Sequence, residues 1–242
     1  MEDREARSLV GRQQLLAFVA LTFAISWAIW WGMALTSMSI GTSGGAVLNV
    51  IALSGPSITA LILSAVLGGG ALHRLLDGFS LGRASARWVV VALVLPLAMI
   101  AVAIAVSVLA FGAPAPVITI ALVGVLAREF VRVLFLGGPL GEELGWRGFA
   151  LPRLQARLTA FRASLLLGLI WGIWHIPLYF VPGTGQFETV SGGTSPSFAI
   201  GAFVVWTIGL SIVALVVVSR FGRANLAHSP AVTVEDSTGR PR

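Results

Sequence analysis

Two adjacent acids followed by an arginine are the most chemically informative residues of this sequence. Glu142 and Glu143 lie in the run GGPLGEELGWRG from 137 to 148, whose glycines and proline are typical of a helix start. On a helix, Glu143 and Arg147 share a face and can form an ion pair. Glu142 is turned about 100° away, so it is left free. A free carboxylate in a partly dry site has a raised pKa, which suits a general base near neutral pH. The alternative is a charged helix start whose acids complement the helix dipole.

The second candidate group is His175, in the run WGIWHIP from 171 to 177. It is the only histidine in an apolar segment, where ionisable side chains are costly and indicate function. The alternative is a histidine that only bonds a neighbouring helix. Trp171 lies on the same helical face, and Pro177 predicts a kink beside His175. His73 is expected in a solvated loop and His228 in a polar tail.

Six apolar segments must position these side chains. Of the 242 residues, 57% are hydrophobic and 11% are charged, compared with about 25% charged in soluble domains. Each segment approaches the roughly 20 residues that a helix needs to cross a bilayer, and lipid offers backbone groups no other partner. The sequence therefore predicts an all-α, polytopic transmembrane helical bundle with about six spans: 14–36, 46–67, 88–111, 117–136, 163–181 and 198–219.

The distribution of basic residues predicts the orientation of these spans. The net charge is +6 and all basic residues are arginines. They avoid every second gap, at 37–45, 112–116 and 182–197, so both termini are expected in the cytoplasm. This pattern favours a bilayer partner over nucleic acid. Trp27, Trp30 and Trp31 are interpreted as an interfacial belt.

Residues 1–222 are interpreted as one transmembrane domain, with a motif-bearing core at about 115–220. The stretch 223–242 is polar and is expected to be disordered. Because the chain has no cysteine, a disulfide framework, a thiolate metal site and a cysteine nucleophile are excluded.

The pattern Glu142-Glu143-x-x-x-Arg147, followed by Trp171-x-x-x-His175, resembles the CPBP intramembrane proteases, also called the type II CAAX prenyl endopeptidase or Abi family. The resemblance implies that Glu142 and His175 activate a water molecule and that Arg147 holds Glu143. Members are often called metalloproteases, so a divalent metal such as zinc is a possible cofactor, although no His-Glu-x-x-His motif supports it. The implied partners are the bilayer and a peptide or protein substrate, which is prenylated for some members.

The family's third motif, His-x-x-x-Asn or His-x-x-x-Asp on a late helix, is missing. The last apolar run has no histidine, and the residue four positions after His228 is Val232. The leading hypothesis is an intramembrane endopeptidase of the bacterial plasma membrane. The alternatives are a weak or inactive relative, acting as a membrane binding or bacteriocin-immunity protein, and a small transporter. For Glu142 to meet the more deeply placed His175, the acid-bearing helix must dip into the membrane.

Overall fold

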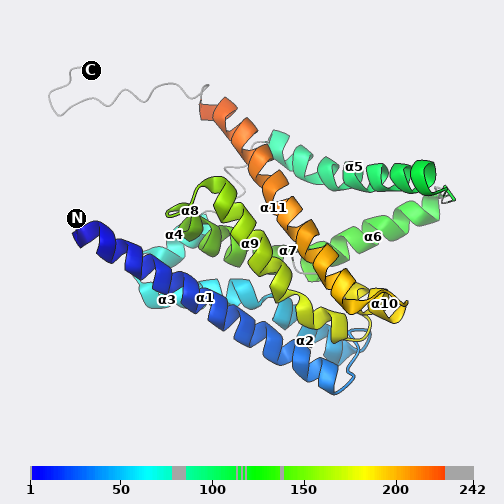
Figure 1. Ribbon diagram of the computed structural model, residues 1–242, viewed down its shortest axis with the longest axis horizontal. Helices are drawn as coiled ribbons and strands as arrows, with labels where there is room; N and C mark the ends of the chain where they lie inside the picture. The colour runs from blue at the N-terminus through cyan, green and yellow to red at the C-terminus, as the bar shows by residue number, and fades with distance from the viewer. Residues whose placement is uncertain are drawn as a thin grey trace.

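The computed structural model describes residues 2–77, 86–112, 114–115, 117, 119–136 and 139–226, and these residues form helices and connecting turns without a strand. Figure 1 shows their arrangement. In chain order the helices are α1 (Glu2–Leu35), α2 (Ser43–Leu53), α3 (Gly55–Leu67), α4 (Ala71–Asp77), α5 (Ala86–Phe111), α6 (Ile120–Leu136), α7 (Pro139–Glu143), the π-helix η2 (Leu144–Ala150), α8 (Leu151–Gln155), α9 (Ala160–Trp174), the 3-10 helix η3 (Ile176–Phe180), α10 (Gly185–Ser191) and α11 (Pro196–Leu226).

The predicted all-α class is confirmed, and each of the six apolar segments is helical. Within the described residues, Gly11–Leu35 and Ala160–Phe180 are each long and apolar enough to cross a bilayer, and the bent pair α2–α3 would be a third span. Helix α11 continues to Leu226, and the rest of the predicted polar tail, with His228, lies outside the described residues.

The second apolar segment, expected as one helix, is broken in the middle. Helices α2 and α3 meet at Ser54 with a bend of 48°. Pro56 lies in the first turn of α3, where a backbone N–H would have no partner within the helix. Its ring would clash with the carbonyl four residues earlier, which prevents α2 and α3 from forming one continuous helix. The Ser26 hydroxyl of α1 donates to the Ala52 carbonyl at 2.7 Å, so a backbone acceptor near the break is satisfied. This break makes room for the acid-bearing segment.

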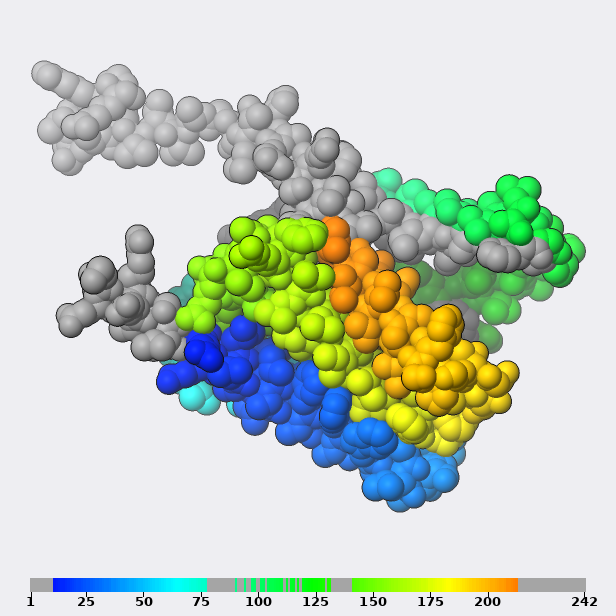
Figure 2. All heavy atoms as spheres, viewed as in Figure 1, coloured from blue at the N-terminus to red at the C-terminus, as the bar shows by residue number. Residues whose placement is uncertain are grey.

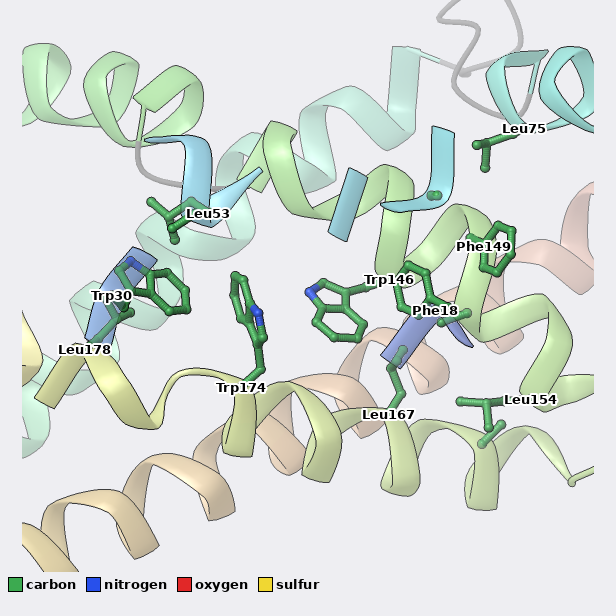
Figure 3. Close-up of a cluster of buried hydrophobic side chains, with 14 of the residues drawn as sticks. Phe18, Trp30, Leu53, Leu75, Trp146, Phe149, Leu154, Leu167, Trp174 and Leu178 are labelled. Carbon is green, nitrogen blue, oxygen red and sulfur yellow. The ribbon is translucent and has the colours of Figure 1, made fainter. Parts of the chain in front are cut away.

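Large aromatic side chains fill the core between α1, η2 and α9 (Figure 3). The ring of Trp174 packs against Trp30 and Trp146, with centroids 4.8 and 5.7 Å apart. The interpretation of Trp30 as part of an interfacial belt is therefore wrong: it is fully buried, and its indole N–H donates to Asn49 at 2.9 Å. Trp27 also turns inward, because its N–H donates to the Trp174 carbonyl at 2.9 Å.

Helices α9 and α11 lie side by side at close range, as the space-filling view shows (Figure 2). Glycines on α9 permit this approach: a Cβ at Gly168 would lie 2.7 Å from the Ile208 Cα, and one at Gly172 would lie 2.7 Å from the Thr207 hydroxyl. Thr207 also donates across the interface to the Gly168 carbonyl at 3.0 Å. Small residues and interhelical hydrogen bonds are the usual means of helix association in lipid. They fix α11 beside the helix that ends at His175.

Candidate active site

The two acids lie in a short helix that enters the molecule beside the α2–α3 break. Helix α7 begins at Pro139, as the sequence predicts, and contacts both α2 and α3. A Cβ at Gly141 would lie 2.9 Å from the Ser54 hydroxyl, and one at Gly145 would overlap the backbone of Pro56. These glycines let the segment sit directly against the broken helix. The bend thus admits the acid-bearing helix between other elements.

The segment after the acids is a π-helix rather than a regular α-helix. In η2 the N–H of Leu151 bonds to the Trp146 carbonyl, five residues back. Such wide turns are rare and frequently occur at functional sites. Trp146 and Phe149 are fully buried in this turn, whereas Arg147 is partly exposed. The sequence did not predict the π-helix.

The predicted ion pair between Glu143 and Arg147 is present. Arg147 Nη1 lies 2.7 Å from Glu143 Oε1, and the two side chains are 30% and 37% exposed. Burial raises the pKa of Glu143, while the adjacent guanidinium opposes that rise. The arginine therefore favours an ionised Glu143 and leaves Glu142 to other partners.

Glu142 is only 5% exposed and accepts a hydrogen bond from the indole N–H of Trp171 at 2.7 Å. The residue lies outside the candidate spans. Burial raises the pKa of Glu142 from 4.5 to about 7, although the Trp171 bond lowers it in part. A carboxyl with a pKa near neutrality populates both its acid and base forms around pH 7, which suits proton transfer.

His175 lies just beyond the last residue of α9, with its side chain buried. Its Nδ1 lies 2.8 Å from the Trp171 carbonyl oxygen. A carbonyl can only accept, so Nδ1 carries the proton and Nε2 is left as an acceptor. The backbone changes to the 3-10 helix η3 at Ile176, with Pro177 in its first turn, so the predicted kink is present.

Trp171 touches every candidate residue except Glu143. Its N–H binds Glu142, its carbonyl binds His175, and its ring lies 5.3 Å from the imidazole. The Arg147 guanidinium carbon lies 5.0 Å from the indole centroid, a distance suited to a cation–π contact. The sequence placed Trp171 beside His175, but its bond to Glu142 was missed. The sequence did contain a signal for this bond, because the indole of Trp171 carries an N–H donor one helical turn from His175. The acid and the imidazole thus share one hydrogen-bonding partner, Trp171, which bonds to Glu142 through its indole N–H and to His175 through its backbone carbonyl.

His73 does not join this group, and His228 lies outside the described residues. His73 Nε2 lies 3.3 Å from an Asp77 carboxylate oxygen on α4, where its side chain is 82% exposed. From α11, an aromatic ring faces His175 instead: the Phe203 centroid lies 5.0 Å from the imidazole.

The described residues do not supply the ligand set that a catalytic metal needs. Catalytic zinc normally takes three protein ligands. Across the described parts of the chain, no three His, Cys, Asp or Glu side chains come together in that way. Glu142 and His175 alone do not fit a zinc site, so the chemistry below involves no step through a metal.

Comparison with known proteins adds a second line of evidence. Residues 127–228 match the family model described as Rce1-like, type II CAAX prenyl endopeptidase. The predicted resemblance is confirmed. All four candidate residues lie inside the match to the Rce1-like family. A relative named CAAX prenyl protease 2, from Methanococcus maripaludis, is 50% identical over 62 residues, which cover 25% of this chain.

The chain spans about a quarter of that relative, since the aligned residues cover 23% of its length. The Rce1-like match and the apolar helices together indicate an integral membrane protein.

Proposed function

We propose that this chain is an intramembrane endopeptidase of the CAAX protease type, with Glu142 as the general base. The observation that carries the proposal is the burial of Glu142 together with its hydrogen bond from the Trp171 N–H. The carbonyl of the same Trp171 bonds to His175, while Arg147 pairs with Glu143 instead. The family match over 127–228 supports the same assignment.

The proposed reaction is hydrolysis of a peptide bond. Ionised Glu142 takes a proton from a water molecule while His175 Nε2 accepts a hydrogen bond from it, so the water oxygen is directed at the carbonyl carbon. The new C–O bond forms, the C–N bond breaks, and protonated Glu142 returns its proton to the leaving amine. Glu143 and Arg147 hold the helix that carries the base. A base placed in this way typically contributes about 10²–10⁴-fold to the rate.

The proposed substrate is a peptide presented in or next to a bilayer. The relative's name includes prenyl protease, so prenylated C-terminal peptides are the first class to test. An unprenylated peptide of the same sequence is the comparison. We propose the bacterial plasma membrane as the location, and the arginine distribution of the loops predicts that both termini face the cytoplasm.

Purified protein in liposomes should cleave such a peptide, and His175→Asn should reduce the rate at least tenfold. Asparagine keeps a donor for the Trp171 carbonyl but removes the acceptor at the position of Nε2. Cleavage is followed with a fluorescence-quenched peptide. The control is Glu188→Gln, a change at an exposed position of α10. Equal rates in His175→Asn and the control would contradict the role of His175.

The rate should rise with pH through a midpoint near 7, because only ionised Glu142 acts as a base and burial raises its pKa to about 7. Below pH 6 the rate should fall about tenfold per pH unit. Trp171→Phe removes the N–H that favours the ionised form, so the midpoint should move to higher pH. The measurement is kcat/KM from pH 5 to 9. A rate lowered equally at every pH would show that Trp171 has only a structural role.

A second candidate is a non-catalytic membrane relative that binds peptides without cleaving them. The observation that favours it is Phe203, since an aromatic ring faces His175 from the late helix. The family's third motif would supply a polar side chain from such a helix. Peptide binding by wild-type protein without cleavage at any pH from 5 to 9 would support this candidate over the protease.

A further inference from the structure

A separate cavity of about 280 Å³ lies between α3, α4, η2 and α8, away from the proposed active site. Its lining residues include none of the four candidate site residues, Glu142, Glu143, Arg147 and His175. Its polar groups include two arginines, Arg74 on α4 and Arg153 on α8, whereas no acidic side chain is among its lining residues. A pocket with two cations and no anion is suited to an anionic ligand.

Among the described residues, the partners that fix the guanidinium of Arg153 are all neutral. Its Nε donates to the Gln14 side-chain oxygen at 3.0 Å and its Nη1 donates to the Phe149 carbonyl at 2.9 Å. The group also stacks over the Phe149 ring, 3.4 Å from its centroid. Burial lowers the pKa of Arg153. Among the described residues no carboxylate pairs with it, so its charge is oriented but not neutralised.

Arg74, an exposed residue of α4, lines the same cavity next to the turn between α3 and α4. This turn consists of Gly68, Gly69 and Gly70, which all have positive φ. The conformation lets the Gly69 carbonyl accept from Arg74 Nη1 at 2.8 Å. The acid of α4, Asp77, lies instead beside His73. Arg74 is therefore also held by a neutral backbone group, and within the described parts of the chain its other N–H groups remain for a ligand.

The contact of Arg153 with Gln14 gives the depth of the cavity in a bilayer. The candidate span of α1 is Gly11–Leu35, 25 residues long. At 1.5 Å per residue it measures about 37 Å, several ångströms more than the roughly 30 Å of hydrocarbon. Its first turn, with Gln14, thus lies near the boundary with the lipid headgroups. The arginine distribution predicts this boundary to be the cytoplasmic one.

We propose that this cavity binds the phosphate group of an anionic phospholipid, with Arg74 and Arg153 as its ligands. Guanidinium groups form charge-assisted hydrogen bonds with phosphate oxygens, often two at a time. Basic pockets between membrane helices are known to take lipid headgroups. The acyl chains of the same lipid would extend along the apolar helices next to the pocket.

The test measures lipid binding to the purified full chain in detergent. Phosphatidylglycerol, phosphatidylcholine and inorganic phosphate are titrated separately, and native mass spectrometry and the shift in Tm report binding. Because a bound ligand stabilises the folded state, each Tm is compared with that of the same variant without ligand. Wild-type protein should bind phosphatidylglycerol at least tenfold more tightly than phosphatidylcholine.

The double variant Arg74→Gln/Arg153→Gln should lose this preference. The matched control is Arg12→Gln/Arg162→Gln, which removes the same charge at two exposed positions outside the cavity and should keep it. Arg153→Lys retains the positive charge and should keep part of the preference. This variant distinguishes a specific loss of binding from a loss of folding in the double variant. Equal binding of the two lipids, or equal loss in the control, would overturn the proposal. Equally tight binding of inorganic phosphate would overturn the assignment to a lipid.

Discussion

Glu142→Gln should lower peptide cleavage by about 10²–10⁴-fold at pH 7, the largest effect expected of any single change in this chain. Glutamine has nearly the same shape, and its amide oxygen can still accept from the Trp171 N–H. The amide cannot take a proton from water, so the loss falls on the chemical step. The expected result is a much lower kcat with little change in KM, measured in liposomes with the quenched peptide.

Two comparisons make the experiment decisive. Glu143→Gln breaks the ion pair with Arg147 but keeps the base, so its rate should lie between those of wild type and Glu142→Gln. The Tm of Glu142→Gln should be at least that of wild type above pH 7, because a buried carboxylate that must ionise is replaced by a neutral group. Cleavage that survives Glu142→Gln unchanged would refute the assignment of the base.

Gly145→Ala should lower the free energy of unfolding by about 1–3 kcal/mol and cleavage by about a hundredfold. The added methyl group would overlap the carbonyl carbon and oxygen of Pro56, which are backbone atoms with little freedom to move. Either η2 shifts away from α3 or the bend opens, and both displace Glu142 from Trp171. The measurements are Tm, followed by intrinsic fluorescence of the 8 tryptophans, and the cleavage rate.

Gly201→Ala is the matched control for this substitution. A Cβ at Gly201 would meet no atom within 4 Å, and alanine favours a helix interior by about 1 kcal/mol over glycine. The control should therefore equal or exceed wild type in Tm and keep its activity. If Gly145→Ala behaves like Gly201→Ala, the backbone contact with Pro56 does not position the acid.

The parts of the structure that follow local rules could be predicted from the sequence. The six apolar segments form helices because lipid and hydrophobic burial leave few alternatives. The start of α7 at Pro139 follows from proline chemistry, and the pair of Glu143 with Arg147 follows from their spacing. These predictions need only neighbours within one or two turns of the chain.

The features that were predicted wrongly or missed depend on contacts between distant segments. Gly55 and Pro56 were visible in the second apolar segment, but hydrophobicity alone suggested one helix through them. Trp30 was assigned to the membrane surface because of its position near the end of a span. Its burial arises from Trp174, which is more than a hundred positions later in the chain. The π-helix likewise forms where η2 packs on α3, and no spacing rule contains that contact.

The contact of Gly145 with Pro56 involves main-chain atoms on both sides and the proline Cβ. The distance between the acid-bearing segment and the broken helix is therefore set without the help of any side chain larger than a proline ring. Exposed apolar positions of α3, such as Ile62 and Val66, take no part in this contact and can change without moving the carboxylate. The position of the acid therefore depends on the absence of a methyl group at Gly145 and on the bend between α2 and α3. It depends little on which apolar side chains occupy the exposed positions of α3.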